Sequence, residues 1–127
     1  MENDLFMAFC KSGRVEDMQD MIKKNSNYVT LKDPLGNTGV HYAAHGNHSE
    51  AVAVLLNSKS DPNARNNVGD TALHQSAPKS NKEVIEILIK SGADLMIKNN
   101  DGKIAQEYAK DVVISDLLAP SIESRII

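Results

Sequence analysis

A repeat of 33 residues constrains this chain more than any other feature of its sequence. When the sequence is shifted by 33 positions, Gly36, Gly69 and Gly102 align without a gap. Residues 34–66 and 67–99 then share nine identical positions, whereas unrelated sequences of ordinary composition would share about two. Such a period predicts a repeat protein, in which each unit packs only against its neighbours.

Each unit is expected to hold two short helices joined by a tight turn. In the unit at 34–66, Thr38 is placed to cap the first helix, because its hydroxyl can accept from a free N–H of the first turn. Gly46-Asn47 tolerates the left-handed backbone that a helix–helix turn needs, and a second helix is expected from about Ser49 to Ser58. Neither helix is long enough to be stable alone in water, so stacking must supply the stability.

Two stretches of the chain carry a family signature. They read Gly36-x-Thr38-Gly39-Val40-His41-x-Ala43-Ala44 and Gly69-x-Thr71-Ala72-Leu73-His74-x-x-Ala77. Both resemble the G-x-T-P-L-H-x-A-A signature of ankyrin repeats, and Ser91-Gly92-Ala93-Asp94 resembles the G-A-D finger that follows it in that family. The resemblance implies an all-α fold, an ankyrin-repeat solenoid of stacked helix-turn-helix units joined by β-hairpin-like fingers.

The resemblance covers nearly the whole chain and divides a single domain, residues 1–127, into four units. Residues 1–33 correspond to an N-terminal capping repeat, 34–66 and 67–99 to two full repeats, and 100–127 to a C-terminal capping repeat and tail. Polar outer faces on the two terminal units are what the solubility of a solenoid demands.

The sequence departs from the family pattern at several positions, including Gly39 and Ala72 in place of the family proline and Asn47 in place of a glycine. The usual glycine between the helices is Ser80 in the unit at 67–99, and Pro78 precedes it. Because serine adopts left-handed backbone poorly, we expect this turn to be strained or rearranged, with Pro78 ending the first helix early. In the last unit, Ile104, Gln106 and Glu107 replace the threonine, leucine and histidine of the family, so its assignment depends on spacing.

Composition and charge argue against several kinds of partner. The net charge is −3 and no block of like charge occurs, which argues against nucleic acid or an anionic membrane surface as the main partner. No run approaches the roughly 18 apolar residues of a membrane span, and the acidic start Met1-Glu2-Asn3-Asp4 does not look like a secretory signal. With Cys10 as its single cysteine, the chain is expected in a reducing compartment, the cytoplasm or the nucleus.

Three histidines are the strongest candidates for chemistry. His41 and His45 stand at i and i+4, a spacing that can chelate a metal ion, and His48 follows closely. A metal-binding or small enzymatic protein that uses these side chains is therefore the alternative hypothesis. The favoured interpretation takes His41 and His74 as the family histidine, which the resemblance implies to hydrogen-bond backbone between repeats. Cys10 is expected to be a small packed residue, and no catalytic residue, metal or cofactor is predicted.

The resemblance implies a non-enzymatic protein–protein interaction module, an adaptor, inhibitor or chaperone of a partner protein, and we expect it to be a monomer. A purely structural part of a larger assembly is a third hypothesis. In this family's geometry, finger tips and first-helix ends meet the partner on the concave face. The partner-binding residues predicted on that basis are Pro34, Leu35, Asn37, His45, Asn67, Val68, Asp70, Lys79, Asn100, Asp101 and Lys103. Lys11 and Ser12 complete the row of first-helix ends, while Leu35 and Val68 stand out as apolar tips.

Overall fold

All regular structure is helical in the computed structural model of this protein, which describes residues 1–120. Seven α-helices and three 3-10 helices follow one another, with no strand in this described part. They are α1 (Glu2–Ser12), α2 (Val15–Lys24), η1 (Ser26–Thr30), α3 (Gly39–His45), α4 (Ser49–Asn57), α5 (Ala72–Ser76), η2 (Ala77–Lys79), α6 (Lys82–Lys90), η3 (Ala105–Tyr108) and α7 (Val112–Leu117). Within residues 1–120, no helix is both long enough and apolar enough to span a membrane. The all-α prediction is confirmed, while the last seven residues of the predicted C-terminal cap and tail (100–127) lie outside the described residues.

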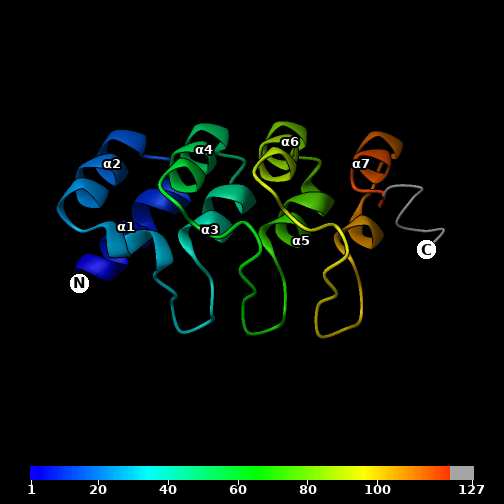
Figure 1. The fold of residues 1–127 in the computed structure, drawn as a ribbon, viewed down its shortest axis with the longest axis horizontal. Coiled ribbons are helices and arrows are strands. Elements are labelled where there is room, and N and C mark those ends of the chain that lie inside the picture. Colours follow the sequence, from blue (N-terminus) through cyan, green and yellow to red (C-terminus); the bar gives the residue numbers. More distant parts are fainter. Residues whose placement is uncertain (121–127) are drawn as a thin grey trace.

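The helices form pairs that stand side by side in chain order (Figure 1). One layer holds α1, α3 and α5, the other holds α2, α4, α6 and α7, and the connecting loops extend away from the helices on one side. Each helix contacts the matching helix of the next pair, as α1 contacts α3 and α4 contacts α6. Contacts between neighbouring pairs therefore hold the described part of the chain together.

A threonine precedes each of α3 and α5 and is hydrogen-bonded to the histidine three residues later. The N–H of His41 donates to Thr38 Oγ1 (3.4 Å), and the N–H of Thr38 donates to His41 Nδ1 (3.1 Å). Thr71 and His74 repeat the second of these bonds, with 3.1 Å from Thr71 N to His74 Nδ1. The predicted cap at Thr38 is confirmed, and α4 ends at Asn57, close to its predicted end.

Proline shortens the first helix of the next pair. α5 ends at Ser76, and residues 77–79 continue as η2, because Pro78 has no N–H to donate and its ring restricts the residue before it. Ser80 then takes a left-handed backbone with φ of 55°, as Asn47 does at the matching turn with φ of 59°. The early helix end and the unfavourable serine conformation expected from the sequence are confirmed.

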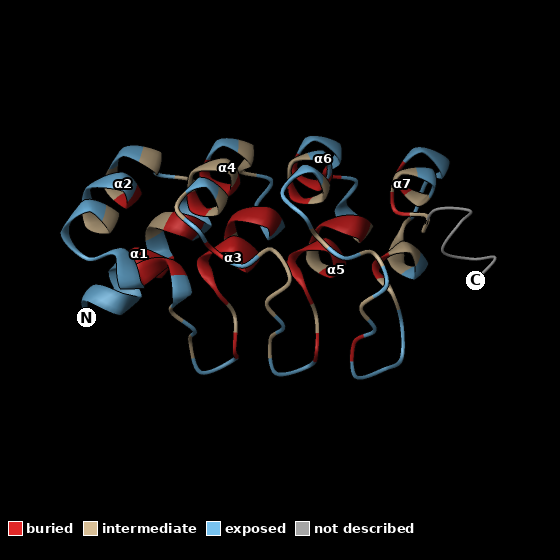
Figure 2. Ribbon diagram, viewed as in Figure 1, coloured by how far each residue is buried: buried red, intermediate tan, exposed pale blue. Residues whose placement is uncertain are grey.

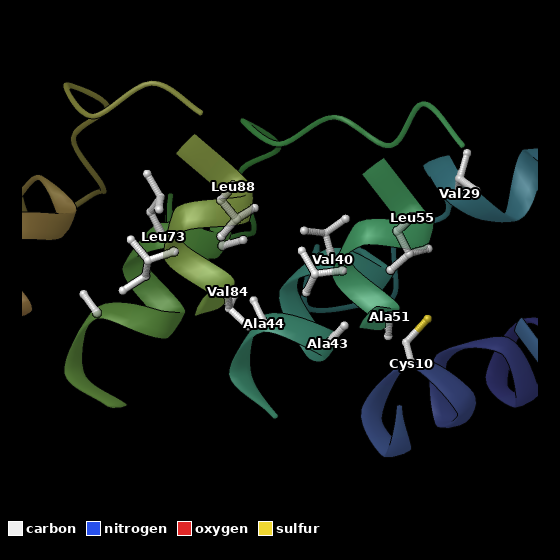
Figure 3. Close-up of a cluster of buried hydrophobic side chains, with 14 of the residues drawn as sticks. Cys10, Val29, Val40, Ala43, Ala44, Ala51, Leu55, Leu73, Val84 and Leu88 are labelled. Atoms are coloured by element: carbon white, nitrogen blue, oxygen red, sulfur yellow. The ribbon is translucent and has the colours of Figure 1, made fainter. Parts of the chain in front are cut away.

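The apolar core runs along the whole row of helix pairs, between the two layers (Figure 2). Ala43, Ala44 and Ala77 are fully buried, and their small side chains let neighbouring helices approach closely. Larger side chains such as Leu55 and Leu88 fill the space between the layers (Figure 3). Because every pair shares this core with its neighbours, no single pair can bury its apolar face alone.

Cys10 belongs to this core. Burial raises the pKa of its thiol to about 12, so the thiol stays protonated near neutral pH and is a poor nucleophile. A Cβ added at Gly39 would lie 2.8 Å from the Cys10 sulfur, so glycine allows α3 to pack directly on α1. The prediction that Cys10 is a small packed residue is confirmed.

The last helix pair is reduced in size. η3 spans only Ala105–Tyr108, and α7 has six residues. Glu107 replaces the family histidine, and its Oε2 accepts from the N–H of Ile104 at 2.8 Å. Asp111 caps α7 by accepting from the N–H of Ile114 at 2.8 Å. The carboxylate of Glu107 therefore accepts the backbone hydrogen bond that the histidine ring accepts in the two preceding repeats.

Lys59 provides a test of backbone strain. Its φ is 77°, and its counterpart one repeat later is Gly92, with φ of 97°. The Lys59 side chain is exposed, so replacing it by glycine removes little more than the unfavourable Cβ. Lys59→Gly should raise the free energy of unfolding by about 1 kcal/mol. Urea denaturation followed by circular dichroism measures the change, and a loss of stability would contradict the strain.

Ser80→Gly is the matched control for this substitution. It also relieves a left-handed residue, but it removes the bond from Ser80 Oγ to Asp111 Oδ2, which is 2.6 Å long. We therefore expect a smaller gain than for Lys59→Gly. Equal gains would show that the bond to Asp111 contributes nothing to stability.

Candidate functional site

Three loops beside the helix layers share one internal geometry. We call them the tip loops, residues 33–37, 66–70 and 99–103. Each begins with Asp33, Asn66 or Asn99, whose Oδ1 accepts two backbone hydrogen bonds. For Asp33 the donors are the N–H groups of Leu35 (3.0 Å) and Asn37 (2.9 Å). The same two bonds recur at Asn66 and Asn99 with lengths of 2.9–3.1 Å, so a side-chain oxygen shapes each loop from within.

Neighbouring tip loops are hydrogen-bonded to each other. Asn67 donates from its N–H to the carbonyl of Leu35 (3.0 Å) and from Nδ2 to that of Pro34 (2.8 Å). Asn100 donates in the same way to the carbonyls of Val68 (3.0 Å) and Asn67 (3.1 Å). Both asparagines belong to the predicted binding set, and their amides already have partners within the protein.

A buried histidine joins each of α3 and α5 to the tip loop that follows it. His41 Nε2 lies 2.8 Å from the carbonyl oxygen of Asp70, and His74 Nε2 lies 2.8 Å from that of Lys103. Because Nδ1 of His41 accepts from the N–H of Thr38, the ring proton resides on Nε2, which donates to Asp70. The predicted role of His41 and His74, hydrogen bonding to backbone between repeats, is confirmed.

Tyr42 ties the first tip loop to α3 and α1. Its hydroxyl donates to Asp33 Oδ2, and the ammonium of Lys11 lies 4.5 Å from its ring centroid. Partial burial and the bond to Asp33 raise the pKa of Tyr42. Partial burial also raises the pKa of Asp33, but the hydrogen bonds from Tyr42 and the backbone outweigh it and hold the pKa below its usual value. Asp33 is therefore a carboxylate bound within its own loop.

Two hollows lie between the tip loops and the ends of the first helices. The first, of about 370 Å³, is lined by Lys11, Asn37, His41, Tyr42, His45, Gly46 and Gln75. The second, of about 390 Å³, is lined by His45, Val68, Asp70, His74, Gln75, Pro78, Lys79, Asn99, Asp101 and Tyr108. His45 and Gln75 line both hollows, so the two form one surface, which we call the inner groove.

The inner groove brings together part of the predicted binding set. The members that line it are Asn37, His45, Val68, Asp70, Lys79 and Asp101, together with Lys11. Outside its lining are Pro34, Leu35, Asn67, Asn100 and Lys103 on the tip loops, and Ser12 on α1. Leu35 and Val68 are 64% and 58% exposed, so two consecutive tips present apolar surface at or beside the groove.

Among the groove-lining residues absent from the predicted set are three at one repeat position: Tyr42, Gln75 and Tyr108. They occupy one position of successive repeats, 33 residues apart. Tyr108 accepts from Asn99 Nδ2 at 2.8 Å, and the ammonium of Lys103 lies 5.6 Å from its ring centroid. The sequence carries a signal for them, because the position after the family histidine holds a large side chain in each unit.

The three histidines of the metal hypothesis have different surroundings and do not point to a shared site. His41 is buried, with both ring nitrogens hydrogen-bonded, and His48 Nε2 lies 2.9 Å from the carbonyl oxygen of Lys11. His45 is exposed at the groove, where partial burial and the charge of Lys79 lower its pKa. Among residues 1–120, no three His, Cys, Asp or Glu side chains gather in a way that could hold a metal ion. A metal ion here would have to displace the bonds that join α3 to its neighbours.

A protein-family model described as Ankyrin repeats (3 copies) matches residues 5–99 of the chain. The chain belongs to the ankyrin-repeat family. Ankyrin repeats are generally protein–protein interaction modules and are typically non-enzymatic. The resemblance read from the stretches at 36–44 and 69–77 is therefore confirmed.

Longer curated proteins share part of this ankyrin-repeat sequence. Oxysterol-binding protein-related protein 1 from Homo sapiens is 34% identical over 64 residues, which make up 50% of this chain and 7% of that protein. The proteins of the same name from Rattus norvegicus and Mus musculus match to the same extent. The match covers a small part of these relatives, so it supports the shared repeats alone.

The buried ring of His41 makes the free energy of unfolding depend on pH. Burial lowers its pKa below the ordinary value of 6.5, although the bond to the Asp70 carbonyl acts in the opposite direction. The folded state therefore favours the neutral ring. This stabilisation is complete above pH 6.5 and is lost as the pH falls through the lower folded-state pKa.

His41→Leu isolates this contribution, because leucine leaves both the N–H of Thr38 and the carbonyl of Asp70 without the ring as a partner. It should cost about 2 kcal/mol of unfolding free energy at neutral pH. The gap between the variant and the wild type should narrow as the wild-type histidine becomes protonated. Urea denaturation at a series of pH values measures the gap, and a gap that stays constant into acid would contradict the prediction.

An Asn→Asp substitution should lower stability by different amounts at the equivalent positions Asn66 and Asn99 of two tip loops. Asn66 donates from Nδ2 to Asn37 Oδ1 (2.9 Å), whereas Asn99 donates from Nδ2 to Asp70 Oδ1 (2.9 Å). Asn99→Asp sets two carboxylates against each other and should cost about 2 kcal/mol. Asn66→Asp faces an amide that can turn its NH₂ group, and should cost less than about 1 kcal/mol. Thermal unfolding measures both variants, and equal losses would contradict the role of Asp70.

Proposed function

We propose that this protein is a non-enzymatic binding module that holds a protein partner in the inner groove and against the adjoining tip loops. One observation carries the proposal: His45 and Gln75 line both hollows, so a single surface extends from the end of α1 to η3. A surface of that shape suits an extended stretch of a partner. In this role the protein acts as an adaptor, inhibitor or chaperone of the protein that it binds.

The chemistry of the surface supports this use. Val68 lines the groove and Leu35 lies on the neighbouring tip, while Tyr42 and Tyr108 contribute rings that carry a polar group. Tyrosine is enriched in interfaces because it offers apolar area together with a hydrogen-bonding hydroxyl. Apolar side chains surrounded by Asn, Asp, His and Lys match the apolar centre and polar rim of protein interfaces.

The proposal keeps the four-unit division of the sequence. Residues 1–33 act as the N-terminal cap and 100–127 as the C-terminal cap and tail. They flank the repeats at 34–66 and 67–99, in a solenoid whose fingers are the tip loops and whose concave face is the inner groove. The module works as a monomer in the cytoplasm or the nucleus, without a cofactor. Sedimentation at low protein concentration tests the monomeric state.

The two apolar tips provide the test of the binding surface. Leu35→Asp combined with Val68→Asp should abolish capture of the partner, because it places charge at the apolar centre of the interface. Both side chains are mostly exposed, so the melting temperature should stay almost unchanged. Affinity capture from the source cell with wild-type and variant protein, followed by mass spectrometry, identifies the partner and measures its loss.

Val112→Asp combined with Val113→Asp is the matched control. These valines lie on α7, in the other helix layer, and are 73% and 57% exposed. The control removes a similar amount of exposed apolar surface and adds the same charge, so the partner should still be captured. If the partner is retained by the tip-loop variant and lost in the control, the binding surface lies on the outer helices instead.

A further inference from the structure

We infer that the segment held in the inner groove is acidic on one edge and apolar on the other. Its Asp or Glu side chains meet the ends of the first helices, and its apolar side chains meet Leu35 and Val68 on the tip loops. This inference rests on the proposed function, because it concerns the same groove.

Three nitrogen-bearing side chains line the groove where the first helices end, and we call Lys11, His45 and Lys79 the basic edge. Lys11 lies in the last turn of α1, His45 ends α3 and Lys79 ends η2, and all three are exposed. His45 is close enough to Lys79 for that charge to lower its pKa. The three side chains therefore form one continuous band of positive and hydrogen-bonding groups.

Two carboxylates near the groove, Asp33 and Asp70, accept hydrogen bonds from neutral donors, while Asp101 lines the groove on the side of the tip loops. Asp33 accepts from Tyr42 and from two N–H groups of its own loop. Asp70 accepts from the side-chain amides of Asn99 (2.9 Å) and Gln75 (3.2 Å). Asp33 and Asp70 thus have their hydrogen bonds without a lysine.

Asp111, next to the last member of the basic edge, is held in the same way. It accepts from Ser80 Oγ at 2.6 Å and caps α7. Within residues 1–120, the single ion pair closer than 4.0 Å joins Arg14 to Asp17, and neither residue lines the groove. Lys11 and Lys79 therefore form no ion pair within 4.0 Å in the described part of the chain, although Lys11 is close enough to Asp33 to help lower the pKa of that carboxyl. A carboxylate brought by a ligand would supply a direct partner.

The tip loops, on the other side of the groove, present exposed apolar side chains to a partner. Leu35 and Val68 project from consecutive tips whose backbones are joined by the bond from the N–H of Asn67 to the carbonyl of Leu35 (3.0 Å). Their spacing is therefore fixed before a partner arrives, which lowers the entropy lost on binding. A nucleic acid would also bring negative charge, but the apolar edge and the net charge of −3 favour a protein segment.

A random peptide library displayed on phage tests this inference without knowledge of the natural partner. Selection on the immobilised full chain should enrich peptides that combine Asp or Glu with apolar residues. Their binding should weaken as salt concentration rises, because exposed charges are screened. Enrichment of basic or uncharged peptides would overturn the inference, as would equal binding of a fluorescent single-stranded oligonucleotide.

Charge reversal at the basic edge provides the second measurement, by fluorescence anisotropy with a selected peptide. Lys11→Glu combined with Lys79→Glu should weaken binding about tenfold or more, because two attractive pairs become repulsive. Lys11→Gln with Lys79→Gln removes the charge without adding repulsion, so it should weaken binding by a smaller factor. This variant replaces the charge-reversed one if charge reversal lowers the stability of the protein. The control is Lys24→Glu with Lys90→Glu, which changes two exposed lysines at the ends of the outer helices α2 and α6 and should leave binding unchanged.

The variants separate failure of this inference from failure of the proposed function. Peptides lost with Leu35→Asp and Val68→Asp, but bound equally by the Lys11→Glu, Lys79→Glu variant, would overturn the acidic edge and keep the groove. Peptides bound equally by both variants would place the site elsewhere and overturn the proposed function as well. A library that yields no binder sensitive to the groove contradicts both.

Discussion

The positions of the third and fourth helix pairs depend on buried histidines, His41 and His74, that join them to the pair before. Each of these two histidines accepts a hydrogen bond from a threonine N–H at Nδ1 and donates one to a tip-loop carbonyl from Nε2. A buried polar group left without its partner costs about 1–3 kcal/mol. The helices that carry these histidines have only seven and five residues, so they have little stability of their own and depend on such contacts.

Fixed register between the pairs also creates the groove. The histidines place the second and third tip loops against the helices, and Asn67 and Asn100 then bond each loop to the one before it. Asp33, Asn66 and Asn99 shape the loops internally. The side chains at the tips are consequently held in place by the same hydrogen bonds that stabilise the repeats, and the surface is ready for a partner without further ordering.

The helix pairs could be predicted from the sequence alone, because the residues that start, end and space the helices are local or periodic. Thr38 marks a helix start, Pro78 a helix end, and the period places equivalent turns. The lining of the groove was harder to predict. Whether an amide such as that of Asn67 faces a partner or a neighbouring loop depends on contacts between units, which no single repeat encodes. Tyr42 was missed for a similar reason, since its side chain is placed by Asp33 and Lys11 from two other segments.

The central claim is that a partner segment lies along the inner groove, between the first-helix ends and the tip loops. Chemical-shift mapping of the backbone amides in a ¹H–¹⁵N spectrum, during titration with a peptide selected on this protein, tests it most directly. The shifts should change at Tyr42, His45, Val68 and Gln75, which line the groove, and stay constant across α4 and α6. Changes concentrated on α4 and α6, with the groove residues unaffected, would contradict the claim.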